Sequence, residues 1–324
     1  MSITGDVYKN LIREYDEKRL QSQARSRSLK EHIEEEIPRL KEIEGEIASL
    51  HVKNVSAKLR GASFEDAPAV AALLAEKKAL LAAHGYSEAD LLEKYECPLC
   101  QDTGFTSKGP CSCFKRRLTD ILYESSNIKE VLKEENFSTF SFEYYSNEPI
   151  STGSSLTQKE LAQRAYNTAR AFVSDFPSSQ ENLFINGGCG TGKTFLSNCI
   201  AKEVIEAGYF VVYLSASKLF DILSSAVFEK DESARQLAKH IYDCDLLIID
   251  DLGSELSNSF TSSALFGCIN ERLTQRSHTI ISTNLTAKQL KETYSERIFS
   301  RIANRYIMIK LLASDIRMKK RLEI

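Results

Sequence analysis

The sequence of 324 residues predicts an α/β domain built on a parallel sheet, preceded by a helical region and a small four-cysteine module. Three observations support this prediction. Strand-like and helix-like patterns alternate from about residue 138 onward, as in sheets whose strands are joined by helices. Apolar residues recur at helical spacing between Tyr8 and His84. Two close cysteine pairs lie in between. We therefore expect three parts, comprising residues 1–92, 93–137 and 138–324.

The composition limits the class of protein. A hydrophobic content of 42% and a charged content of 27% are typical of globular proteins. The net charge of −3 argues against a uniformly basic surface, so any contact with nucleic acid must be a local patch. No apolar run has the length of a membrane span, and the first residues lack the apolar core of a signal peptide. We expect a cytoplasmic protein whose eight cysteines are thiols or metal ligands.

The N-terminal region has the spacing of a coiled coil or a helical hairpin. Its apolar seam consists of Ile33, Leu40, Ile43, Ile47 and Leu50. Pro38 interrupts the seam, residues 61–63 suggest a turn, and a second helix is expected from Pro68 to His84, ending at Gly85. Such a stripe indicates packing, either within the region or against a partner helix.

The cysteine module has the spacing of a tetrahedral zinc site. Its four candidate ligands are Cys97, Cys100, Cys111 and Cys113. A thioredoxin-like redox pair is the alternative for the first two, but it requires a βαβ setting, and the preceding sequence is helical. The basic run Lys115–Arg117 follows directly. Such a run is a solvated face or a contact for nucleic acid or an acidic partner.

The α/β part is expected to contain five strands. They are expected at residues 182–186, 209–216, 246–250, 279–284 and 306–311. Helices are expected at 195–207, within 217–242, and at 261–275, 287–294 and 296–304. The strand at 246–250 has no polar side chain before its last residue, as in a parallel sheet covered on both faces.

A complete phosphate-binding loop follows the first of these strands. It consists of Gly187, Gly188, Cys189, Gly190, Thr191, Gly192, Lys193 and Thr194. Glycines let backbone N–H groups curve around phosphate oxygens, and the next helix adds its free N–H groups. Lys193 is placed to reach the β- and γ-phosphates, and Thr194 to bind Mg²⁺. The sequence therefore predicts binding of a nucleoside triphosphate with magnesium.

Two carboxylates end the third expected strand. Asp250 is placed to hold Mg²⁺ beside the phosphate loop, and Asp251 to orient or deprotonate the attacking water. Most ATPases of the broad class have Glu at the second position. The shorter Asp251 predicts slow intrinsic hydrolysis, which suits a switch.

Polar residues after the fourth strand extend this set. Asn284 is expected to hold the water or to sense the γ-phosphate. Arg297 and Arg301 lie four residues apart on one helix face. A guanidinium there can act on the phosphate of a neighbouring subunit, with Arg301 preferred, although either arginine can instead pair with nearby acids.

These motifs together resemble the AAA+ ATPases, and within them the replicative-helicase loaders of the DnaC/DnaI type, which include the transposition helper IstB. The resemblance rests on residues 246–253, 270–273, 280–285 and the D-I-R ending at 314–321, where Ala313 replaces a common Gly. Residues 84–86 and 95–105 are similar to the zinc module of the Gram-positive DnaC-like branch. The match covers roughly residues 84–321.

The resemblance implies an AAA+ domain with a five-stranded parallel sheet that binds ATP, Mg²⁺ and single-stranded DNA. It implies side-by-side self-association, delivery of a hexameric replicative helicase gripped by the N-terminal region, and slow hydrolysis stimulated by assembly or DNA. Arg317, in the D-I-R ending, is expected at the nucleotide. The segment 217–242 is expected to steer DNA with four cations: Lys218, Lys230, Arg235 and Lys239.

Three alternatives stay open. A transposition-helper ATPase shares the same motifs. An ATP-binding adaptor with little hydrolysis is compatible with Asp251. A nucleotide or small-molecule kinase would share the phosphate loop, but it needs neither Asn284 nor the arginine-bearing helix.

Overall fold

The structure is a computed structural model of the chain that describes residues 3–60, 66–124, 128–151, 155–176, 178–229 and 232–322. The chain forms two compact units, one of residues 12–113 and one of residues 1–11 together with 114–324. Within the described ranges, no helix combines the length and the apolar character needed to cross a bilayer.

The unit of residues 12–113 is built on three helices, namely α1 (Ile3–Glu36, which begins in the other unit), α2 (Arg39–Leu59) and α3 (Ala67–Ala83). The predicted break at Pro38 is confirmed, because α1 and α2 end and begin on either side of it. The seam residues Ile33 and Leu40 are buried and pack with Leu81 of α3. The prediction of a helical hairpin is therefore confirmed. The turn expected at 61–63 lies outside the described residues.

Ion pairs join α2 to α3 along the hairpin. The Arg39 guanidinium lies 2.9 Å from the Glu76 carboxylate, and Lys77 Nζ lies 2.7 Å from Glu44. The same unit contains a short helix, η1 (Glu88–Leu91), and the two-stranded hairpin of β1 (Phe105–Thr106) and β2 (Gly109–Pro110). That hairpin separates the two cysteine pairs.

The larger unit alternates helices and strands. Its elements are α4 (Ser112–Glu124, which begins in the other unit), α5 (Ile128–Glu134), α6 (Gln158–Asp175), β3 (Leu183–Gly187), α7 (Lys193–Glu206), β4 (Val211–Ser215), α8 (Ala216–Phe228), α9 (Glu232–Asp243), β5 (Leu246–Leu252), α10 (Ser259–Gln275), β6 (His278–Thr283), α11 (Ala287–Thr293), α12 (Glu296–Arg305), β7 (Ile307–Leu311) and α13 (Ile316–Leu322).

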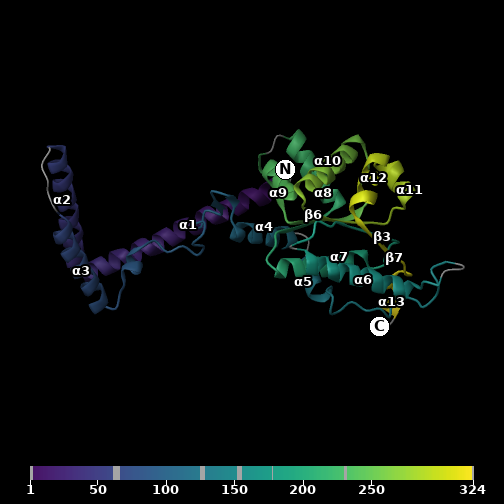
Figure 1. Cartoon of the computed structure of the whole chain (residues 1–324), viewed down its shortest axis with the longest axis horizontal. Helices are drawn as coiled ribbons and strands as arrows, with labels where there is room; N and C mark the ends of the chain where they lie inside the picture. Colours follow the sequence, from purple (N-terminus) through teal and green to yellow (C-terminus); the bar gives the residue numbers. More distant parts are fainter. Residues whose placement is uncertain are drawn as a thin grey trace. The chain divides into compact units, whose positions relative to one another are not determined.

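The five strands form one parallel sheet in the order β4-β5-β6-β3-β7. Figure 1 shows α5, α6 and α7 on one side of the sheet and α8, α9 and α10 on the other. The strand interiors are buried, as expected for a sheet covered on both faces. This arrangement confirms the predicted fold class, an AAA+ type of phosphate-loop domain preceded by helices.

Two strand boundaries differ from the prediction by two residues, and the other differences are of one residue. β4 begins at Val211 rather than Tyr209, because Gly208 takes a positive φ and Tyr209 N donates to Val204 O, which ends α7. β5 extends beyond Asp250 to Leu252, with a register irregularity after Ile249. An apolar run therefore locates a strand, but it does not fix the residues at which pairing starts and stops.

Candidate nucleotide and metal sites

The phosphate loop joins β3 to α7, as the sequence predicts. Gly190 and Gly192 have φ values of 69° and 93°, a region that residues with a Cβ seldom adopt. A Cβ on Gly192 would lie 2.7 Å from the Tyr145 hydroxyl, which itself donates to Thr191 O at 3.0 Å. The loop is therefore held tightly from the side of Tyr145, a residue that the sequence did not single out.

Lys193 is held inside its own loop. Its ammonium donates to Gly187 O at 2.9 Å and to Gly188 O at 2.8 Å. Burial lowers the pKa of Lys193, and attraction from Asp251 and other nearby groups opposes this shift. The ammonium is thus held by two carbonyls of its own loop and is attracted by Asp251 and Asp250.

The structure brings the two predicted magnesium ligands together. Thr194 Oγ1 lies 3.0 Å from Asp250 Oδ2, although the two residues come from α7 and β5. Ser282 of β6 donates a short hydrogen bond to the other Asp250 oxygen. A hydroxyl and a carboxylate at this distance fit Mg²⁺, which takes few protein ligands and keeps several waters. Ser282, which fixes the carboxylate, was missed by sequence analysis because only the strand order places it there.

Asp251 is set apart from Asp250 by its backbone. Its φ is 57°, and its N–H donates to Ser282 Oγ at 2.9 Å. The side chain is exposed, at the register irregularity of β5. A non-glycine residue in the left-handed region is uncommon, and such positions cluster at functional sites.

Asn284 directly follows β6, which lies between β5 and the phosphate-loop strand β3. Its side chain is exposed. Nearby, Asn186 Nδ2 donates to Leu285 O at 2.6 Å and so joins the end of β3 to the segment after β6. Asn284 therefore follows the strand that separates the phosphate-loop strand from the strand of the paired carboxylates.

The C-terminal segment returns to the phosphate loop. Ile316 N donates to Gly190 O at 2.9 Å, and Arg317 Nη2 lies 4.0 Å from Cys189 Sγ. A Cβ on Gly190 would lie 2.1 Å from a carboxylate oxygen of Asp315. A cavity of about 390 Å³ lies along the loop, and its lining includes Lys193, Thr194 and Arg317. This volume is within the usual range of ligand pockets.

Arg297 and Arg301 are not part of this cavity. Both lie exposed on α12, and Arg301 lines a separate cavity beside Asn182, the residue before β3. The phosphate loop follows the other end of that strand. Neither arginine forms an ion pair within the described part of the chain.

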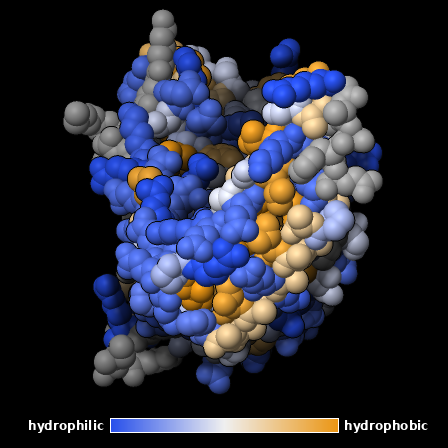
Figure 2. All heavy atoms as spheres, turned by 90° about the vertical axis from the view of Figure 1, so that its left-hand side faces the viewer, coloured by the Kyte–Doolittle hydropathy of each residue, from blue (hydrophilic) through white to orange (hydrophobic). Residues whose placement is uncertain are grey.

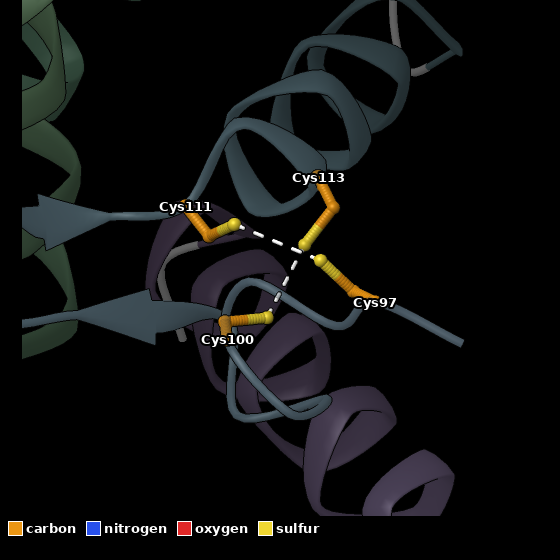
Figure 3. A group of neighbouring side chains, drawn as sticks. All are labelled: Cys97, Cys100, Cys111 and Cys113. Atoms are coloured by element: carbon orange, nitrogen blue, oxygen red, sulfur yellow. Dashed lines mark hydrogen bonds between the residues drawn. The ribbon is translucent and has the colours of Figure 1, made fainter. Parts of the chain in front are cut away.

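The four cysteines converge, and their side chains point toward one another (Figure 3). All four sulfur atoms lie within 4.8 Å of one another. The Cys97–Cys111 and Cys100–Cys113 sulfur distances are 3.8 and 3.5 Å. Zn–S bonds of about 2.3 Å place the sulfurs of a tetrahedral site about 3.8 Å apart. The cluster can therefore hold a tetrahedral metal such as zinc.

A buried carboxylate supports the cysteine cluster. Asp102 is fully buried and accepts from Cys97 N at 2.8 Å, from Glu96 N at 3.0 Å and from Ser22 Oγ of α1 at 2.8 Å. Asp102 has a φ of 57°. It fixes the turn that carries the first cysteine pair.

The family model described as IstB-like ATP binding protein matches residues 154–322, just over half of the chain. The chain belongs to the IstB-like ATP-binding protein family. The matched residues run from the segment before α6 to α13 and include the phosphate loop, both carboxylates, Asn284 and Arg317. ATP binding is thus a property of the family to which these residues belong.

Two of the curated relatives of this IstB-like protein are named as replicative helicase loaders. The replicative helicase loader DnaC of Escherichia coli K12 is 22% identical over 143 residues, 44% of this chain and 58% of that protein. The replicative helicase loader DnaI of Bacillus subtilis is 23% identical over 215 residues, 64% of this chain and 59% of that protein. The chain thus matches somewhat over half the length of these relatives.

Solved structures similar to this IstB-like protein include those of the same two loaders. The DnaC helicase loader has a TM-score of 0.46 at 22% identity, covering 56% of this chain and 99% of that chain. DnaI has a TM-score of 0.43 at 21% identity, covering 51% and 90%.

Proposed function

We propose that this chain is an ATP-dependent loader of a replicative DNA helicase, in which the AAA+ domain is a nucleotide switch. The observation that carries the proposal is the contact between Thr194, at the end of the phosphate loop, and Asp250 of β5. ATP and Mg²⁺ would bind there, with Arg317 on the nucleotide and Asp251 on the attacking water.

Slow hydrolysis would follow from the geometry of Asp251. Its carboxylate has one methylene fewer than Glu, and its backbone is already in the left-handed region. A base that reaches the water poorly favours a long-lived ATP state, which suits a switch. Arg301, placed away from its own phosphate loop, would complete the ATP site of a neighbouring subunit, with Arg297 as the alternative.

Single-stranded DNA would contact the face formed by α8, α9 and the start of α10. Phe228 is 67% exposed, and its ring lies 5.1 Å from that of Phe260. Aromatic side chains of this kind stack on bases, and nearby cations track the backbone. Three of the four expected cations, Lys218, Arg235 and Lys239, lie on α8 and α9. Lys230 lies outside the described residues.

The helical hairpin would bind the hexameric helicase. Its exposed apolar side chains are Val52 (65%), Val55 (58%), Leu59 (84%) and Leu74 (45%). Figure 2 shows a band of hydrophobic side chains between hydrophilic ones on the face that α2 and α3 turn to the viewer. Exposed apolar patches of this kind mark surfaces for protein partners. Zinc in the cysteine cluster would stabilise the unit that carries the hairpin.

The functional division that we propose has residues 1–92 for the helicase, 93–137 for zinc and the connector, and 138–324 for ATP. The test mixes full-length protein with the replicative helicase of its own organism and measures helicase loading on circular single-stranded DNA with ATP. Loading should require Lys193, and helicase capture should fail in Val55→Asp but persist in Lys78→Ala, an exposed control on α3. Absence of both capture and loading by the wild type would refute the proposal.

A transposition-helper ATPase is the second candidate, because the matching family model is described as IstB-like. It would stimulate DNA strand transfer by a transposase and would not capture the helicase. An ATP-binding adaptor would capture the helicase without measurable turnover. The same mixture therefore separates all three.

A further inference from the structure

A second cavity, which the proposed function does not explain, lies at the amino ends of strands β3 and β6. The phosphate loop follows the opposite, carboxyl end of β3. It has a volume of about 360 Å³, close to that of the cavity along the loop. Asn182, just before β3, and Ser277, just before β6, lie on its wall. The five residues of β3 separate it from the phosphate loop, a distance of about 16 Å. The second cavity is thus outside the nucleotide site of the same chain.

Three arginines line this cavity. Arg276 follows the end of α10, Arg305 is the last residue of α12, and Arg301 lies one turn before it. None of the described lining residues is acidic, and the three guanidiniums have no ion pair in the described part of the chain. Two like charges four residues apart on a helix repel each other, so the arrangement favours an anion.

The charge of the cavity can be compared with that of its ligand. The C-termini of α10 and α12 each contribute roughly −0.5 elementary charge, which leaves about +2 from the three guanidiniums. A terminal phosphate carries about −1.5 to −2 charges near pH 7, whereas a phosphate within a DNA strand carries one. Guanidiniums also match phosphate oxygens in pairs of hydrogen bonds. The cavity thus fits a terminal phosphate better than a DNA backbone.

The backbone conformation at Arg276 also supports an anion site. Its φ and ψ are 59° and 31°, the left-handed conformation that usually places Gly at the end of a helix. A side chain at this position is unfavourable for the backbone, so its presence calls for another explanation. The guanidinium in the cavity supplies one.

The floor of the cavity is rigid. Asn182 is buried, and its side-chain oxygen accepts from Thr279 N at 2.7 Å while its backbone oxygen accepts from Ile307 N at 2.7 Å. One residue therefore ties the starts of β3, β6 and β7 together. The amide nitrogen of Asn182 lies 3.5 Å from Arg305 O, which fixes the end of α12 against this floor.

We propose that Arg276, Arg301 and Arg305 form a binding site for the terminal phosphates of a nucleotide. Two sources share this chemistry, namely free nucleotide in solution and the ATP held in the phosphate loop of a second copy. The second source rests on the proposed function and extends the role of Arg301 to a three-arginine site.

The test uses full-length protein and two substitutions that remove guanidiniums without requiring new packing. Arg276→Gly suits the left-handed backbone and should leave the thermal unfolding temperature equal or higher. Arg305→Gln keeps a polar side chain of similar length. Arg164→Gln, at an exposed position on α6, is the control.

Calorimetry with inorganic tripolyphosphate on the Lys193→Ala background isolates the second cavity. If nucleotide from solution is the ligand, binding should be saturable and at least about tenfold weaker in the double variant than in the control. If a second copy supplies the phosphates, ATP should drive self-association of the wild type in sedimentation, and the double variant should lose it.

In both cases the double variant should still bind a fluorescent ATP analogue at the phosphate loop. That measurement tests the proposed function by itself, since only the Lys193 substitution should abolish it. Unchanged tripolyphosphate binding together with unchanged self-association would overturn the three-arginine site. Loss of single-stranded DNA binding alone would also overturn it, in favour of a nucleic-acid surface.

Discussion

The strongest test of the fold concerns Arg272, a fully buried arginine on α10 that pairs with no carboxylate in the described part of the chain. Its guanidinium donates to the carbonyl oxygens of four residues and to the Thr279 hydroxyl at 3.0 Å. The four carbonyls belong to Ile241, Tyr242, Cys244 and His278. Three of them lie at the C-terminal end of α9, where helix carbonyls lack internal partners. Arg272 thus replaces water for the end of a buried helix.

Arg272→Met should lower the free energy of unfolding by about 4 kcal/mol. Each carbonyl left unpaired in the interior costs about 1 kcal/mol or more, and four carbonyls would lose their hydrogen bond to Arg272. Arg272→Lys should lose less, because an ammonium keeps the charge and up to three of the bonds.

Urea unfolding followed by far-ultraviolet circular dichroism would measure both changes. Arg164→Met, at an exposed site, should alter the free energy by no more than about 0.5 kcal/mol. A loss below about 1 kcal/mol for Arg272→Met would refute the reasoning, because the carbonyls would then have found other partners.

Four further outcomes are expected. Lys193→Ala should abolish tight ATP binding in a fluorescence titration, while Asp250→Asn should reduce magnesium-dependent hydrolysis more than binding. Cys97→Ser should reduce zinc below one ion per chain by metal analysis and leave ATP binding nearly intact; equal metal content would exclude the cysteine site. Arg301→Ala should bind ATP but hydrolyse it poorly, by a factor on the order of 10³, and mixing it with Lys193→Ala should restore activity at mixed interfaces. Burial lowers the pKa of His240 to about 4, so the folded state resists protonation. The free energy of unfolding should therefore fall as the pH drops from about 6.5 toward 4, by up to about 3 kcal/mol, and His240→Phe should remove this slope in pH-dependent unfolding.

The local chemistry of the site was predictable from the sequence. The phosphate loop is one continuous segment, so its glycines, Lys193 and Thr194 are recognisable without any tertiary information. The cysteine cluster is similar, since close spacing within each pair limits where the sulfurs can lie. The strands were also found, because each is a short apolar run between turn residues.

The lateral order of the strands was not predictable in the same way. Nothing in the chain order places β6 between β3 and β5, yet this insertion brings Ser282 against Asp250. Tyr145 and Asp315 reach the loop from 46 residues before Thr191 and from the C-terminal segment. A buried arginine such as Arg272 runs against the usual exposure of charged residues, so its burial could not be predicted from the sequence.

Asp102 also affects the order in which this protein can fold as it is synthesised. Its contact with Ser22 spans 80 residues of chain. At about 5–20 residues per second, α1 waits roughly 4–16 seconds for the carboxylate that joins it to the cysteine turn. During that interval Ile33 of the N-terminal helix can already pack against Leu40 and Leu81, but the last cysteine arrives later still. The four-cysteine cluster cannot be completed before the whole of α1 has left the ribosome. Metal binding is therefore a late event in the synthesis of this unit.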